Sequence, residues 1–421
     1  MYAFSSRFAI LVGLLGSFAL VSDKCGAGDW PQILGPNRNG IAQDEPAINV
    51  WPKSGPKRKW TFEVGSGFAG PAIVGDRVLI FHRVADSERV ECIDIPSGRG
   101  LWKTDFAASY APGFNPDNGP RCVPLVYKDR VFVAGAAGDL HCVMLADGAT
   151  AWSRDPYTDY EGQEGYFGAG STPIVVGDKL LVNVGGRSAG LVAFDLTNGK
   201  TIWKATDERA SYSSPITAMV NGKLYAVFLT RLNCVAVDPA TGQIAFKFPF
   251  GMTGPTVNGA TPLVFDDKLF VSASYSIGAR LCKLGNPSVP IWTNDDTMSS
   301  QYTTSVYRGG FLYGIHGRED HRNGELRCIE GNTGKISWKV PGFGTGHLIL
   351  VNNQLLILTT EGDLVLAKAE PGKYSELARA KISSDTTRSL PAFSRGRFIF
   401  RDNADTHGRL NCLELAATAQ N

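Results

Sequence analysis

A short pattern recurs along this chain and constrains its fold more than any other feature. A cysteine or alanine is followed ten residues later by a tryptophan or phenylalanine, with a turn between them that often contains glycine. An internal repeat of this kind is considered before local structure, because it sets the whole architecture. The pairs are Cys92/Trp102, Cys142/Trp152, Ala193/Trp203, Ala236/Phe246, Cys282/Trp292 and Cys328/Trp338.

Each pair closes a longer unit of four short apolar segments. A unit opens after a proline or small residue, passes through a turn such as "GDR" or "NGK" into a β-rich segment, and ends with the cysteine and tryptophan segments. Four strands repeated at about 42–53 residues are typical of a propeller blade. The units open at residues 71, 124, 173, 215, 262, 305, 348 and 391. The sequence therefore predicts an all-β, eight-bladed β-propeller of four-stranded antiparallel blades.

The last unit lacks its fourth strand, because the chain ends soon after "LNCLEL". The segment "KRKWTFEV" (57–64) supplies an equivalent strand, with Trp60 in the repeated tryptophan position. We expect this N-terminal strand to complete the last blade, which closes the ring and removes its exposed edges. The predicted organisation is a signal peptide (1–27), an arm (28–56), the propeller (57–415) and a tail (416–421).

The N-terminus predicts export. Arg7 precedes fourteen largely apolar residues (8–21), too few to span a bilayer but typical of a signal-peptide core, with cleavage expected after Ala27. A short buried helix is the alternative. Lipidation at Cys25 is disfavoured, because charged residues precede it. We expect a periplasmic or extracellular protein with no transmembrane segment in the mature chain.

The remaining cysteines are predicted to pack rather than react. Seven would remain after cleavage, and six lie in the recurring strand. The repeat holds such positions apart, whereas a disulfide needs Cα atoms within about 7 Å. Alanine replaces cysteine at 193 and 236, so a small buried side chain is what the position requires.

The charge balance argues against nucleic acid as a partner. The chain has 42 basic and 40 acidic residues, a formal net charge of +2, and no long run of like charge. A protein that tracks phosphates needs a basic face.

The repeated "[A/C]-x-D-x-x-T-G-x-x-x-W" pattern resembles the PQQ-like repeat of the quinoprotein alcohol dehydrogenase-like superfamily of eight-bladed propellers. The resemblance covers nearly all of 57–415, and the segment "DWPQILGPNRNGI" is similar to secreted, BamB-like bacterial propellers. The resemblance implies the fold. It leaves function open, because the superfamily holds quinone-dependent dehydrogenases as well as BamB, a non-enzymatic scaffold for outer-membrane protein assembly.

The residues that dehydrogenase members of this superfamily commonly carry are not recognisable in the sequence. Those members have a vicinal cysteine pair beside the quinone, a Ca²⁺ site and an aspartate base, whereas no two cysteines are adjacent here. No residue of this chain is therefore assigned as catalytic or metal-binding. Pyrroloquinoline quinone (PQQ) with Ca²⁺ stays the alternative cofactor set.

The loops before each first strand predict a ligand-facing ring at one mouth of the channel. The residue three before each opening gives Phe68, Arg121, Gly170, Tyr212, Gly259, Tyr302, Thr345 and Arg388, and the long loop 159–170 adds Glu164 and Tyr166. Arginines and tyrosines suit an anionic aromatic ligand. We take Arg121, Glu164, Tyr166, Tyr212, Tyr302 and Arg388 as candidates. The alternative is that these side chains fill the channel and pair with neighbouring loops.

We therefore expect an exported, monomeric, non-catalytic binding or scaffold propeller that engages a protein partner or small ligand at this mouth. A PQQ- and Ca²⁺-dependent alcohol or sugar dehydrogenase is the alternative, and a glycan-binding or structural envelope protein is a third class. The arm is either a partner-binding strand or a lid on the propeller. We favour the lid.

Overall fold

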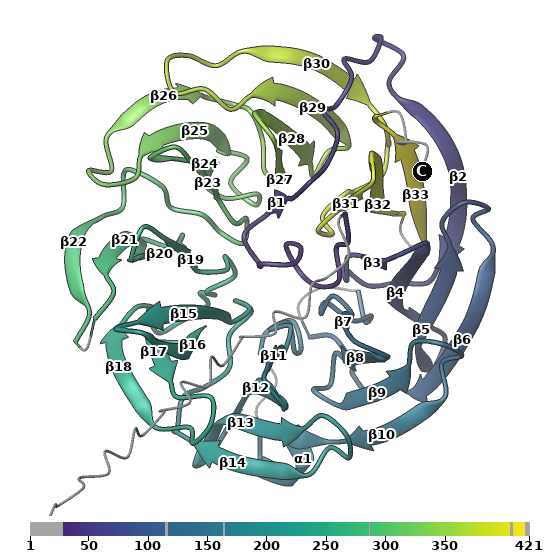
Figure 1. The fold of residues 1–421 in the computed structure, drawn as a ribbon, viewed down its shortest axis with the longest axis vertical. Helices are drawn as coiled ribbons and strands as arrows, with labels where there is room; N and C mark the ends of the chain where they lie inside the picture. Colours follow the sequence, from purple (N-terminus) through teal and green to yellow (C-terminus); the bar gives the residue numbers. More distant parts are fainter. Residues whose placement is uncertain (1–27, 114–116, 163–164, 286, 405–406, 417–421) are drawn as a thin grey trace, which may run out of the picture.

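The computed structural model describes residues 28–113, 117–162, 165–285, 287–404 and 407–416. Eight antiparallel sheets stand around a central axis, and Figure 1 shows them as a closed ring. The first strand of each sheet lies nearest the axis and the last forms the rim. The chain is thus the predicted eight-bladed propeller, and its described residues contain one short helix, α1 (Pro156–Tyr160).

Blades 1 to 4 follow chain order from the inner to the outer strand. Their strands are β3 (Ala72–Val74), β4 (Arg77–Val84), β5 (Ser87–Asp94) and β6 (Gly100–Ala107); β7 (Leu125–Tyr127), β8 (Arg130–Ala134), β9 (Leu140–Met144) and β10 (Thr150–Arg154); β11 (Ile174–Val176), β12 (Lys179–Gly186), β13 (Ala189–Asp195) and β14 (Thr201–Ala205); and β15 (Ile216–Val220), β16 (Lys223–Leu229), β17 (Asn233–Val237) and β18 (Ile244–Pro249).

Blades 5 to 8 repeat this order, and the outer strand of blade 8 comes from the N-terminal side of the chain. Their strands are β19 (Leu263–Phe265), β20 (Lys268–Ala273), β21 (Gly278–Lys283) and β22 (Val289–Asn294); β23 (Val306–Arg308), β24 (Phe311–His316), β25 (Glu325–Glu330) and β26 (Ile336–Val340); β27 (Gly346–Val351), β28 (Gln354–Thr359), β29 (Asp363–Lys368) and β30 (Glu376–Lys381); and β31 (Ala392–Ser394), β32 (Arg397–Asn403), β33 (Gly408–Glu414) and β2 (Lys57–Val64).

Strands from both ends of the chain close the ring as predicted. β2 pairs antiparallel with β33, and Trp60 lies opposite Cys412. Blade 7 differs from the expected four strands, because β1 (Ile41–Ala42) pairs in parallel with the inner edge of β27. The arm thus uses backbone groups of an inner edge that would otherwise stay unpaired.

The tryptophans join consecutive blades, which explains why the pattern recurs. In six tryptophans of the repeat, the indole N–H donates to a carbonyl in the turn before the next blade's outer strand. The pairs are Trp60 to Ile95, Trp102 to Leu145, Trp152 to Leu196, Trp203 to Pro239, Trp292 to Gly331 and Trp338 to Glu370, at 2.6–3.1 Å. Gly199, in one of these turns, has a φ of 68°, and a Cβ there would come within 2.8 Å of Trp152. Glycine is required on both counts.

The seven cysteines within the described residues are free and buried. Burial raises the pKa of the Cys92 and Cys122 thiols to about 12, so they stay protonated at neutral pH. The prediction that they serve packing is confirmed.

Candidate functional site

The N-terminal arm covers one mouth of the central channel. Trp30 is 2% exposed and exchanges backbone hydrogen bonds with Ile73 of β3. The Asp29 carboxylate accepts from the N–H of Gly75 (2.9 Å), and that of Glu45 accepts from the N–H of Gly396 (3.0 Å). Both glycines lie in turns between the first and second strands of a blade, so the arm lies on that mouth, as a lid would.

Arg38 anchors the arm from inside the channel. Its guanidinium donates to the carbonyl oxygens of Thr172 (3.3 Å), Pro173 and Pro215 (2.9 Å), which immediately precede the inner strands of blades 3 and 4. The side chain is buried, and burial lowers its pKa to about 9. Arg38 therefore stays cationic at neutral pH, while backbone carbonyls and the side-chain oxygen of Gln32 (2.8 Å from Nε) accept from its donors.

Arg121 lies at the opposite mouth, which is formed by the loops before the inner strands. Its guanidinium donates to the carbonyl oxygens of Asp117 (2.8 Å) and Gly119, and lies 3.6 Å from the Asp117 carboxylate. It also stacks over the ring of Tyr110, 5.2 Å from the centroid. Arg121 is thus bound to its own loop.

Tyr302 and Arg388 come together elsewhere on this mouth. The Arg388 guanidinium lies 5.0 Å from the Tyr302 ring centroid and 5.5 Å from that of Phe68. Both Arg388 and the Tyr302 hydroxyl contact the Glu319 carboxylate at 2.9 Å. Burial raises the pKa of Tyr302, so its hydroxyl donates as a neutral group. Neighbouring loops therefore supply the partners of this pair.

Tyr166 and Tyr212 belong to a different group, around the loop that follows α1. The Tyr212 hydroxyl accepts from the N–H of Phe167 (2.8 Å), and the Tyr166 hydroxyl donates to the carbonyl of Gly254 (3.2 Å). Burial raises the pKa of Tyr212 to about 12. Glu164, the sixth predicted residue, lies outside the described residues. The structure thus distributes the predicted ring over two groups, one above blades 6 to 8 and one above blades 2 to 4.

A cavity of about 510 Å³ opens beside the second group. Tyr110, Tyr166 and Tyr212 line it together with Arg209 and Arg231. The Arg231 guanidinium is held by the carbonyl of Met252 and the hydroxyl of Thr256, both at 2.8 Å, whereas Arg209 is exposed. The volume is within the range of ligand pockets, and the cationic side chains favour an anionic group.

Arg209, Arg231 and Tyr110 were not predicted from the sequence. The prediction took only the residue three places before each blade opening, and therefore one residue from each loop. Arg209 lies three residues before Tyr212, which is the position that the rule selects in this loop. Arg231 belongs to the turn between β16 and β17. Only the alignment of neighbouring blades brings that turn to the mouth.

A second hollow, of about 520 Å³, lies on the other side of the same arginines. Arg209 and Arg231 line it with Leu232 and Ile244, which are 38% and 45% exposed. Exposed apolar side chains continue around the pair. We call this area the blade 3–4 surface and define it by Tyr166, Phe167, Arg209, Arg231, Leu232, Ile244 and Met252.

A buried acid lies near this mouth, in blade 1. Glu88 is 1% exposed, and one carboxyl oxygen accepts from the N–H of Ala136 (2.9 Å). The other has no hydrogen-bond partner within the described part of the chain. Burial, and then repulsion from Asp139, raises the pKa of Glu88 to about 7.

The sequence of this chain matches the model of a known protein family. The model of a family described as "Outer membrane protein assembly factor BamB" matches residues 86–340, more than half of the 421-residue chain. The chain belongs to this family. This agrees with the resemblance found in the repeat.

Two known proteins, a BamB and a quinohemoprotein alcohol dehydrogenase, are similar to this chain in sequence. Outer membrane protein assembly factor BamB of Burkholderia pseudomallei (strain K96243) is 20% identical over 279 residues, which cover 65% of this chain and 69% of that protein. Quinohemoprotein alcohol dehydrogenase ADH-IIG of Pseudomonas putida is 27% identical over 177 residues, 39% of this chain and only 24% of the enzyme. This chain therefore spans about a quarter of the dehydrogenase that it matches.

Among solved structures, BamB from Moraxella catarrhalis superposes with a TM-score of 0.63 at 14% identity, covering 87% of this chain and 99% of that chain. At this identity the likeness shows the fold alone. The residues described here include no group of three or more His, Cys, Asp or Glu side chains that could hold a metal ion. Nor do they include a helix of the length and apolarity needed to cross a membrane.

Proposed function

We propose that this chain is an exported binding propeller, and that the mouth opposite the arm is a non-catalytic site that engages a protein partner or a small ligand. The blade 3–4 surface carries the proposal. Phe167, Leu232, Ile244 and Met252 are 37–45% exposed there, around two arginines and beside a tyrosine-lined cavity. Clustered apolar exposure marks interaction sites, and tyrosine and arginine are enriched among residues that dominate binding energy.

The arm supports the choice of mouth. It covers one end of the channel with Trp30 and Arg38. A partner that reaches the central axis therefore enters from the opposite mouth, which is formed by the loops before the inner strands. The BamB relative, an outer membrane protein assembly factor, supports a protein partner. A monomer remains our expectation.

The test is quantitative capture from a cell-envelope extract with the immobilised chain. We expect at least one protein whose recovery falls about tenfold or more in Arg209→Glu. An acidic group of the partner that faces Arg209 would then face a like charge, which costs several kcal/mol. Arg187→Glu is the matched control, because Arg187 is also exposed and lies in the turn between β12 and β13 on the same mouth. If both variants retain the same proteins as the parent, the proposal fails.

A dehydrogenase that uses PQQ and Ca²⁺ is the second candidate, supported by the ADH-IIG match. Arg209 and Arg231 suit the carboxylates of PQQ, whereas the described residues contain no acidic cluster that fits Ca²⁺. The residues therefore fit the cofactor set only in part, and we derive no catalytic step from it.

Thermal unfolding in Ca²⁺, with and without excess PQQ, separates the two candidates. A one-site ligand at a hundredfold over its Kd stabilises by about 2.7 kcal/mol. We expect no shift. A shift that disappears in an Arg209→Ala/Arg231→Ala variant would favour the dehydrogenase.

A further inference from the structure

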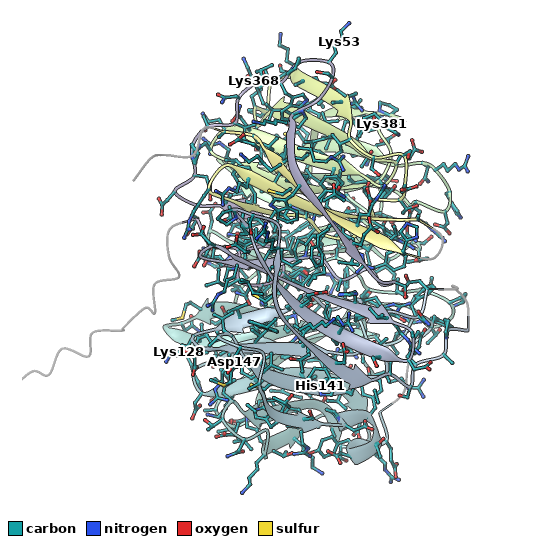
Figure 2. All side chains as sticks on the ribbon, turned by 90° about the vertical axis from the view of Figure 1, so that its right-hand side faces the viewer. Lys53, Lys128, His141, Asp147, Lys368 and Lys381 are labelled. Carbon is teal, nitrogen blue, oxygen red and sulfur yellow. The ribbon has the colours of Figure 1, made fainter. Side chains whose placement is uncertain are left out.

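A serine, a histidine and an aspartate form a hydrogen-bonded chain on the outer flank of blade 2. The Ser153 hydroxyl lies 2.8 Å from Nδ1 of His141, and Nε2 of His141 lies 2.6 Å from Oδ2 of Asp139. Ser153 is exposed on the outer strand β10, whereas His141 is 8% exposed on β9. Figure 2 labels His141 on this flank of the ring.

The partners of the imidazole assign its protons. A carboxylate only accepts hydrogen bonds, so Nε2 of His141 must donate to Asp139. In the neutral ring Nδ1 is then the acceptor, and the hydrogen bond at that atom is donated by Ser153. Phe106 of the adjacent blade stacks on the ring, with centroids 3.6 Å apart and an interplanar angle of 7°, and so restricts its rotation. The arrangement is that of a nucleophile, a base and a group that orients the base.

Ser153 and His141 differ from the residues at the equivalent places of the other blades. The residue after the aromatic of the outer strand is lysine in four blades and threonine in two, and the residue opposite it varies. The pairs across the ladder are Glu91/Lys103, Val192/Lys204, Val235/Lys247, Arg327/Lys339, Arg280/Thr293 and Asn411/Thr61. Blade 2 pairs His141 with Ser153 at this place, and none of the six ladders above pairs a histidine with a serine. The propeller therefore forms without this trio at the equivalent places.

We propose that Ser153 is an activated nucleophile that accepts acyl groups from small activated carboxylic esters. Its Oγ attacks the ester carbonyl carbon and forms an Oγ–C bond, while its proton passes to Nδ1 of His141. Breaking of the ester C–O bond releases the leaving oxygen, which takes that proton. Water, with the same imidazole as base, then hydrolyses the acyl-serine. Asp139 is a positioning residue, because it orients His141 and stabilises the imidazolium. The edge strand β10 leaves Ser153 open to approach.

The test labels the purified full chain with a fluorophosphonate probe and maps the modified serine by mass spectrometry. Ser337 is an internal control, because it is exposed on the outer strand β26 of blade 6. We expect Ser153 to be labelled at least about tenfold faster than Ser337, as an activated hydroxyl should be. Ser153→Ala should abolish this label, and p-nitrophenyl acetate should show a matching burst of p-nitrophenolate.

Asp139→Asn tests the positioning role. The amide can present N–H to Nε2 and stabilise the wrong tautomer, so the labelling rate of Ser153 should fall by at least about tenfold while that of Ser337 stays constant. Circular dichroism of the variant checks that the fold is retained, and His141→Gln is the second variant if it is not. Equal labelling of Ser153 and Ser337 in the parent protein would overturn the proposal without any variant.

Discussion

At the scale of single residues, the buried polar groups differ in how completely they are satisfied. Arg38 has carbonyl partners inside the channel, whereas Glu88 leaves one oxygen without a hydrogen bond among the described residues. A Cβ on Gly135 would collide with carboxyl oxygens of both Glu88 and Asp139, so glycine allows two acids to approach here. An unsatisfied buried carboxylate is costly, and protonation reduces that cost.

We predict a pH-dependent contribution of Glu88 to stability. Its folded-state pKa of about 7 lies above the ordinary 4.5, so the folded state binds the proton more tightly. The contribution is fully present below the unfolded-state pKa and is lost as pH rises through about 7. Urea unfolding at pH 5 and pH 8 should show the parent losing more stability at pH 8 than Glu88→Gln does. Glu63→Gln, an exposed position on β2, should behave like the parent. Parallel pH profiles of parent and Glu88→Gln would contradict this.

At the scale of elements, the arm is the part of the structure that the repeat does not describe. It crosses the channel, contributes β1 to blade 7 and then leads into β2, the rim strand of blade 8, a path visible in Figure 1. Its hydrogen bonds reach blades that are far apart in the sequence. The arm therefore acts as an internal tie between blades as well as a lid.

Replacing Arg38 tests this role. Arg38→Met keeps an unbranched, apolar stem and removes the guanidinium, which leaves the carbonyls of Thr172, Pro173 and Pro215 without that partner. We expect the free energy of unfolding to fall by about 3 kcal/mol, since each buried acceptor left unpaired costs about 1–3 kcal/mol. Urea unfolding measures the change. Arg187→Met is the exposed control, and an equal effect of both substitutions would show that the channel contacts contribute little.

At the scale of the whole molecule, stability depends on closure of the ring. β2 and β33 come from opposite ends of the chain, so their ladder holds the first and last blades together. Each of the six repeat tryptophans adds a hydrogen bond across a blade boundary. Opening of the ring at blade 8 would expose strand edges and remove the neighbour of blade 1.

A disulfide across this closure should stabilise the molecule. Lys57 and Glu414 are register partners on β2 and β33, and such Cα atoms are close enough for a disulfide. We expect oxidised Lys57→Cys/Glu414→Cys to gain about 2–4 kcal/mol against urea relative to its reduced form. The single Lys57→Cys variant, with and without reductant, is the control. If oxidation does not raise the free energy of unfolding, the prediction is wrong, and unfolding begins elsewhere than at blade 8.

The blade count, the closure by residues 57–64 and the burial of the cysteines followed from the sequence alone. Each depends on a pattern that repeats, and in a propeller one repeat packs in the same way as the next. Trp152 and Leu196 illustrate this, because their hydrogen bond recurs between other blades with little change. The fifth strand of blade 7 did not follow, because the two residues of β1 carry no repeat signal.

The candidate site was decided by the tertiary structure. Four of the six predicted residues were chosen for equivalent places in the repeat and two for the long loop 159–170, yet loops differ in length and partner from blade to blade. Arg121 binds its own loop and Arg388 binds Glu319, whereas Arg209 and Arg231 share a cavity with Tyr212. The sequence determined the ring through local, periodic packing. Which loop side chains meet at its mouth depends on non-periodic contacts between neighbouring blades, and only the folded chain defines them.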